Sequence, residues 1–114
     1  QQRDVSRMLE HLGWSNTFEH ETEEGVRIDL ADADAKCAIE VDGPSQYLRD
    51  VTSGERVLDG ASRLKSRLLR ALGWKLSRIS FYEWDGLPDS ERRDLLVRKL
   101  ADLGVHASND DAPV

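Results

Sequence analysis

Residues 26–44 of the chain read VRIDLADADAKCAIEVDGP, and this stretch decides the fold. It holds two runs in which apolar and polar residues alternate, residues 26–31 and 36–42, with the turn-like segment 32–35 between them. Such alternation is typical of β-strands that bury one face. The stretch therefore predicts a two-stranded hairpin.

One face of this hairpin carries carboxylates. Because successive side chains of a strand point to opposite faces, Asp29 lies on one face of the first strand, and the other face carries Val26, Ile28 and Leu30. In the second strand Glu40 and Asp42 alternate in the same way with apolar residues. A four-residue loop places Asp29 opposite Ala38 and makes Glu40 its diagonal neighbour, at about 7–8 Å. The prediction depends on that loop, since a slip of one residue would move one strand's side chains to the other face.

The flanking sequence predicts three helices and two further strands. Runs with helical spacing end three times at a Leu-Gly pair, where glycine supplies the left-handed conformation that stops a helix. We expect helices over residues 4–12, 62–72 and 89–102, with Ser62 and Asp89 as N-caps, and additional strands over residues 17–22 and 75–82. The predicted order is α-β-β-β-α-β-α. Residues 43–60 form a long loop of the kind that is often functional.

The length of 114 residues supports one domain. We place it over residues 1–103 and expect residues 104–114 to be disordered. No stretch approaches the roughly 18 apolar residues of a membrane span, so no membrane association is expected. Because the sequence starts at Gln1 without a targeting segment, we expect a longer parent chain.

Charge is distributed unevenly over the chain. The net charge is −6, yet residues 62–80 contain no acid and hold six basic residues, Arg63, Lys65, Arg67, Arg70, Lys75 and Arg78. A local basic patch attracts phosphate even on an acidic protein, although a solvated helix face gives the same pattern. The acidic remainder leaves open a second class of function, docking onto basic protein neighbours in a ribonucleoprotein or ribosomal assembly.

Lys65 stands out in the predicted helix over residues 62–72. It falls within the predicted apolar arc, which comprises Leu64, Leu68, Leu69 and Leu72. An unpaired buried ammonium is costly, so Lys65 either extends past the helix end to solvent or meets a carboxylate such as Asp29, Glu40 or Asp42. Carboxylates beside a lysine are the groups that Mg²⁺- or Mn²⁺-dependent phosphodiester hydrolysis requires, although acids on an open sheet face are commonly just solvated.

Three motifs in this order resemble the RAP domain: AIEVDGPS at residues 38–45, LKSRLLRALGW at 64–74 and ISFYEW at 79–84. The resemblance spans roughly residues 26–100. It implies an α/β fold of the restriction-endonuclease-like superfamily, similar to very-short-patch-repair nucleases, with a three-layer core of a small mixed sheet and flanking helices.

The resemblance also implies a setting for the chain. RAP domains are usually the C-terminal module of organellar RNA-processing proteins, which include the FAST kinase group in mitochondria and helical-repeat proteins of algae and apicomplexan parasites. RNA is then the expected partner. The expected location is the mitochondrion, with the plastid as the alternative.

The same resemblance assigns site roles residue by residue. Asp29 matches the superfamily's metal-binding acid, and Glu40 matches the first acid of its Glu-x-Lys element. Asp42 stands in the lysine position of that element, and the implied set for Mg²⁺ or Mn²⁺ is therefore Asp29, Glu40 and Asp42. Lys65 then takes the place of the missing lysine, so that the candidate catalytic residues are Asp29, Glu40 and Lys65.

Two auxiliary residues complete this assignment. Gln46 stands where many relatives have histidine after the glycine, which removes one proton donor, and Glu10 on the first helix is a candidate auxiliary acid. We expect an RNA-binding module with a nuclease-like, degenerate site. Its RNA contacts come from Arg63, Arg67, Arg70, Lys75 and Arg78, with Tyr47 stacking on a base. The alternatives are an active metal-dependent endoribonuclease and a protein-interaction module.

Overall fold

The computed structural model describes residues 2–106. Most of the predicted disordered tail, residues 107–114, lies outside these residues. Of the predicted tail, Val105 is ordered: it packs against the core, and its N–H donates to the carbonyl of Leu100 at 2.9 Å.

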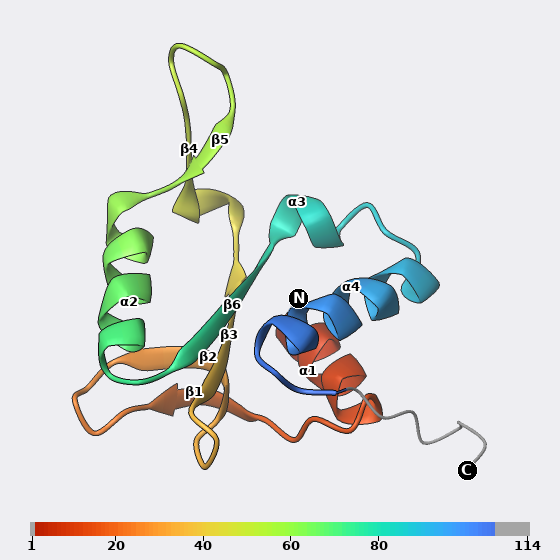
Figure 1. The fold of residues 1–114 in the computed structure, drawn as a ribbon. Coiled ribbons are helices and arrows are strands. Elements are labelled where there is room, and N and C mark those ends of the chain that lie inside the picture. Colours follow the sequence, from red (N-terminus) through yellow and green to blue (C-terminus); the bar gives the residue numbers. More distant parts are fainter. Residues whose placement is uncertain (1, 107–114) are drawn as a thin grey trace.

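A four-stranded mixed sheet forms the centre of the fold, in the order β1-β2-β3-β6 (Figure 1). Its strands are β1 (Thr17–Glu21), β2 (Arg27–Asp32), β3 (Cys37–Asp42) and β6 (Lys75–Ser80). The first three pair in antiparallel fashion, and β3 pairs with β6 in parallel. The predicted α/β class with a small mixed sheet and flanking helices is confirmed.

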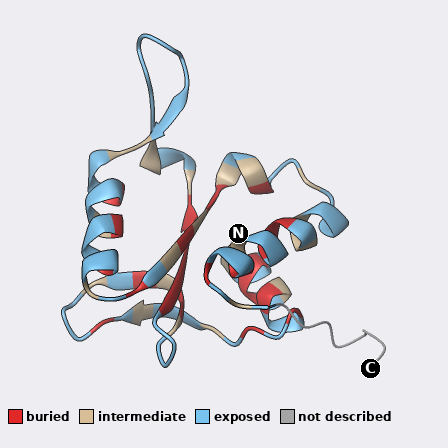
Figure 2. Cartoon of the chain, in the orientation of Figure 1, coloured by how far each residue is buried: buried red, intermediate tan, exposed pale blue. Residues whose placement is uncertain are grey.

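Helices cover both faces of this sheet. Helix α2 (Gly60–Ala71) lies on one face, and α1 (Gln2–His11) and α4 (Asp89–Asp102) lie on the other (Figure 1). The larger apolar cluster joins α1 and α4 to the sheet, and a smaller one joins Leu69 of α2 to Ala38 and Trp74. Burial is concentrated in the central strands and on the inner sides of the helices (Figure 2).

The chain contains more elements than the sequence predicts. The expected loop of residues 43–60 holds a 3-10 helix, η1 (Pro44–Gln46), and a two-stranded antiparallel ribbon of β4 (Tyr47–Arg49) and β5 (Arg56–Leu58). This ribbon projects away from the sheet (Figure 1). Among residues 2–106, no helix combines the length and hydrophobicity that a membrane crossing requires.

Both predicted N-caps of the long helices are wrong. Asp59 caps α2, because its carboxylate accepts the N–H of Ser62 at 2.7 Å, and this bond starts the helix earlier than expected. Ser62 is instead buried within the first turn. In α4 the cap position belongs to Pro88, and Asp89 is the first helical residue.

The last strand also ends earlier than predicted, at Ser80. The Ser80 hydroxyl and backbone N–H both pair with the Glu83 carboxylate, at 2.8 and 2.9 Å. This capping box starts the short helix α3 (Phe81–Trp84), which replaces the predicted strand end.

The register of the central hairpin differs from the prediction by two residues. Ala31 pairs with Ala38, and Asp32 pairs with Cys37. The loop therefore starts after Asp32, and Lys36 adopts a left-handed φ of 52° in it. Because a shift of two preserves the faces, Asp29 moves from a diagonal position to one directly beside Glu40.

The predicted alternation in β2 breaks at Asp29. Ile28 packs with Leu69 on the α2 face, whereas Leu30 belongs to the cluster on the other face. The prediction that these two share a face is wrong. The neighbouring strand turns at the matching position, since Glu19 has a φ of 48°, and His20 beyond it lies 5.8 Å from the ring of Trp74.

Candidate functional site

Helix α2 presents a polar side to the sheet. Its buried residues are Ser62, Ser66 and Leu69. The predicted apolar arc is therefore wrong in part, because Leu64 is 62% exposed and Leu68 is 44% exposed. The orientation follows from the strands beneath, which carry charged side chains under the first half of the helix and apolar ones only under its end.

Lys65 reaches inward to the acids of the hairpin. Its Nζ forms an ion pair with Oε1 of Glu40, whose side chain is only 3% exposed. Oε2 of Glu40 accepts the backbone N–H of Asp29 at 2.8 Å, and Oδ2 of Asp29 accepts the N–H of Val41 at 2.9 Å. These bonds join β2 to β3 beyond the last backbone pair, so the structure brings together all three candidate catalytic residues.

The surroundings of Glu40 make its carboxyl group unusually easy to protonate. The pKa of Glu40 is raised to about 7: burial is the main cause and the charge of Asp29 adds to it, while the Lys65 ammonium and the backbone N–H of Asp29 partly offset both. The charged form is disfavoured because a buried carboxylate loses its hydration.

Asp42 occupies a second buried ion pair. Its Oδ1 accepts from Nη1 of Arg78 at 2.6 Å and from Nε2 of Gln46 at 3.0 Å. Its Oδ2 accepts the hydroxyl of Tyr47 at 3.5 Å. Burial raises the pKa of Asp42, and the Arg78 charge opposes this shift. Gln46 also accepts the N–H of Gly43 through Oε1 at 2.7 Å, so its amide serves to close the turn after β3.

Arg78 is held by the inner side of α2 as well. Its Nε and Nη2 donate to Oγ of Ser66 at 2.9 and 2.7 Å, and Nη2 donates to the carbonyl of Ser62 at 2.8 Å. Sequence reasoning missed these two serines as positioning residues. Their spacing of four in a helix, with Arg78 on an adjacent strand, was the available signal.

Beside this network lies a pocket of about 440 Å³, which we call the arginine pocket. Its lining residues are Leu58, Arg63, Ser66, Arg67, Arg70 and Arg78. Arg63, Arg67 and Arg70 are exposed, and within residues 2–106 none of them forms an ion pair. Four of the five expected RNA-contacting basic residues therefore converge on one open hollow.

Three other predicted site residues lie elsewhere or differ in setting. Lys75 is on the opposite face, with its amine beside Gly104 after α4, because positions 75 and 78 of a strand point to opposite sides. Glu10 is exposed on α1, which covers the face away from Lys65. Tyr47, expected in an open loop, is half-buried in β4.

The predicted metal-binding trio does not fit a divalent cation in this arrangement. Both oxygens of Asp42 and both oxygens of Glu40 already have partners, and Arg78 balances the charge of Asp42. Within residues 2–106, no group of three or more His, Cys, Asp or Glu side chains is placed to hold a metal ion.

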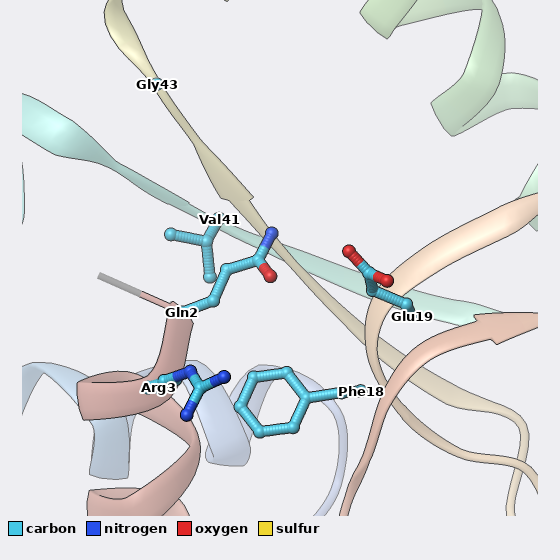
Figure 3. A pocket seen from close by; sticks show the side chains of 6 residues that line it. All are labelled: Gln2, Arg3, Phe18, Glu19, Val41 and Gly43. Atoms are coloured by element: carbon cyan, nitrogen blue, oxygen red, sulfur yellow. The ribbon is translucent and has the colours of Figure 1, made fainter.

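A cavity of about 670 Å³, larger than the arginine pocket, is separate from these residues. It lies between the start of α1, the turn in β1 and the end of β3 (Figure 3). Its lining residues are Gln2, Arg3, Phe18, Glu19, Val41 and Gly43. None of the predicted site residues lines it, so size alone does not mark the chemistry here.

Comparison with known families covers the part of the chain that carries this network. Residues 39–100, more than half of the chain, match the model of the RAP domain family. The chain belongs to the RAP domain family. The match includes the Lys65–Glu40 pair and every residue of the arginine pocket, and it begins after Asp29.

The RAP domain has a relative in rice (Oryza sativa subsp. japonica), a "RAP domain-containing protein, chloroplastic". The two are 33% identical over 102 residues, which cover 87% of this chain and 15% of the relative. The chain thus spans a small part of that protein's length. No solved structure matches the chain significantly.

Proposed function

We propose that this RAP domain binds RNA through the arginine pocket. The observation that carries the proposal is the convergence of Arg63, Arg67, Arg70 and Arg78 on one hollow that contains no acidic side chain. Guanidinium groups match phosphate oxygens in charge and geometry, and spaced phosphates are the repeating feature of an RNA backbone.

The four arginines have different roles in the proposal. Arg78 is fixed by Asp42 and the two serines, and its charge is balanced by Asp42. It forms a rigid wall of the pocket. The three exposed arginines supply the net positive charge, and their freedom from intramolecular ion pairs leaves them available for phosphates.

The salt dependence of RNA affinity tests this proposal. Each phosphate contact to a single strand contributes about −0.7 to the slope of log affinity against log salt. A triple variant with Arg63→Glu, Arg67→Glu and Arg70→Glu should lose most RNA affinity, and its slope should be shallower by about 2. An unchanged slope would contradict the proposal that the arginine pocket binds RNA phosphates.

A matched control uses basic residues outside the pocket. Arg7, Lys75 and Arg98 are exposed and lie on α1, on the opposite face of β6 and on α4. Changing all three to glutamate alters the net charge by the same amount. This control should keep the wild-type slope within error, which separates local phosphate contacts from a general charge effect.

A metal-dependent endoribonuclease is the second candidate. The contact of Lys65 with Glu40, and of Glu40 with Asp29, favours it. The pairing of both Glu40 oxygens argues against metal binding as the residues stand. Incubating single-stranded RNA with the purified domain and Mg²⁺ or Mn²⁺ distinguishes the two candidates. Cleavage that is abolished by Glu40→Ala would establish a nuclease, whereas intact RNA favours binding alone.

A protein-interaction module is the third candidate. The exposed Leu64 and Leu68 on α2 and the acidic remainder of the chain favour it. It predicts that the isolated domain has no measurable RNA affinity, whereas the arginine pocket predicts an affinity that falls with salt.

The relative also bears on location. Because it is described as chloroplastic, we propose the plastid as the location, in place of the mitochondrial one that we expected first. We further propose that the domain acts as one module of a longer RNA-processing protein, consistent with the small share of the relative that it covers.

A further inference from the structure

A cluster of rings joins the projecting ribbon to α3. The Tyr47 ring centroid lies 6.0 Å from that of Phe81 and 5.4 Å from that of Tyr82, and the last two lie 5.5 Å apart. The guanidinium carbon of Arg56 lies 5.6 Å from the centroid of Phe81 and 5.3 Å from that of Tyr82. We call these four residues the aromatic shelf.

The shelf is open to solvent although it is rich in aromatic surface. Tyr82 is 47% exposed and Arg56 is exposed, while Phe81 and Tyr47 are half-buried. Within residues 2–106 Arg56 forms no ion pair with a carboxylate. Packing against the core accounts for the buried parts of the Tyr47 and Phe81 rings. It does not account for the exposed ring of Tyr82 beside Arg56.

The shelf is continuous with the arginine pocket. Tyr47 pairs with Leu58 across the ribbon, and Leu58 lines the pocket. The Tyr47 hydroxyl also donates to Asp42, whose other oxygen holds Arg78 of the pocket wall. An RNA strand whose phosphates bind in the arginine pocket can therefore place a neighbouring nucleotide on the aromatic shelf.

We propose that the aromatic shelf stacks a base of single-stranded RNA, with Tyr82 and Arg56 as the stacking groups. This inference rests on the proposed function and specifies its substrate class. Proteins bind unpaired bases by stacking them on aromatic rings and guanidinium planes. Duplex RNA cannot use the shelf, because its bases are already stacked on one another inside the helix.

The test compares three substitutions at Tyr82, using a labelled 12-nucleotide oligouridylate and a 12-base-pair RNA duplex as probes. Tyr82→Ala and Tyr82→Leu should each weaken binding of the single strand about tenfold and leave duplex binding unchanged. Tyr82→Phe should bind like the wild type, because it retains the ring. Leucine controls for packing, since it fills the space without a π-face.

The outcomes distinguish this inference from the proposed function. If the Tyr82→Leu variant binds the single strand as the wild type does, or loses affinity for both probes equally, the stacking role is overturned while the pocket stands. If the wild type binds neither probe, the proposed function fails and the shelf fails with it. The slope against salt should stay unchanged in the Tyr82 variants, since stacking releases no counterions.

A second variant keeps the inference testable at another residue. Arg56→Ala should weaken binding of the single strand. Arg49 pairs with Arg56 across the ribbon, but its guanidinium donates to the Gly54 carbonyl at 2.8 Å, so Arg49→Ala should have a smaller effect. Equal effects of the two substitutions would indicate general charge attraction and would contradict a specific role of Arg56 in the aromatic shelf.

Discussion

The two faces of the sheet bury different kinds of side chain. Under α1 and α4 the sheet packs into a cluster of fourteen buried apolar residues, whereas under α2 the apolar cluster has five and the remaining space holds two buried ion pairs. Buried ion pairs rarely stabilise a protein more than well-packed apolar residues of similar volume would. The α1 face therefore contributes more net stability, and we propose that the charges under α2 serve another purpose.

That purpose is visible in what the buried charges hold in place. Asp42 fixes Arg78 at the wall of the arginine pocket and contacts Tyr47 of the aromatic shelf. Glu40 fixes Lys65 and, through Asp29, the end of β2. The polar interior thus positions the proposed RNA-binding surface, and substitutions on the two faces should have different consequences.

The largest effect is expected from Asp42→Ala. It leaves the half-buried Arg78 guanidinium without its carboxylate, and it removes acceptors from Gln46 and Tyr47. Loss of one partner of a buried pair costs about 3–5 kcal/mol, which urea unfolding measures. Asp42→Asn should cost less. A loss under about 1 kcal/mol for Asp42→Ala would show that this pair is not a fixed part of the α2 face.

Next in size is Leu96→Ala on the other face. Leu96 is fully buried in the larger cluster, so the cavity should lower the free energy of unfolding by about 2–4 kcal/mol. RNA affinity, measured where the variant is folded, should equal that of the wild type. A folded Leu96→Ala variant with weakened RNA binding would break the division between the faces.

A smaller effect is expected in the pH dependence of stability. The folded pKa of Glu40 is raised to about 7 from an ordinary value of 4.5. The folded state therefore binds the Glu40 proton more strongly than the unfolded state does. The contribution of Glu40 to stability is complete below pH 4.5 and is lost as the pH rises through 7. Relative to Glu40→Gln, the wild type should lose about 1–3 kcal/mol of unfolding free energy over this range.

The comparison with Glu40→Gln removes the contributions of other titrating groups. Asp42 also has a raised pKa. Glu83 has a lowered pKa, because burial, which raises it, is outweighed by its bonds to Ser80 and the charge of Lys99. Both are present in the two proteins and cancel in the difference. A difference that does not change between pH 4.5 and 7.5 would contradict the raised pKa of Glu40.

The smallest effect is expected from the ion pair between Lys99 and Glu83, at 3.5 Å. The Glu83 side chain is 35% exposed, so solvent screens the interaction. Lys99→Met should cost about 0.5 kcal/mol or less. A cost close to that of Asp42→Ala would remove the distinction between ion pairs that the fold buries and those at its surface.

Periodicity predicted the elements that alternate or repeat regularly. The four main strands and three long helices follow from apolar spacing. The ion pair of Lys65 with Glu40 was one of the two alternatives that its place among leucines left open. The shift of the hairpin by two residues kept Asp29 and Glu40 together, so the prediction that these two carboxylates share a face survived an incorrect register.

Features set by tertiary contacts could not be predicted in this way. Leu64 and Leu68 are exposed because the charged strands beneath α2 select its serine side. The exchange of faces between Ile28 and Leu30 occurs opposite Glu19, which has a left-handed φ that glutamate rarely adopts. The ribbon of β4 and β5 escaped detection because its strands are short and charged. The position of Lys75, by contrast, follows from strand alternation with Arg78.

The salt dependence of RNA binding tests the central claim most directly. Wild type, the Arg63, Arg67 and Arg70 triple glutamate variant, and the Arg7, Lys75 and Arg98 control should be titrated with one single-stranded RNA at several salt concentrations. The account predicts a slope shallower by about 2 for the pocket variant alone. Parallel lines for all three proteins would contradict it.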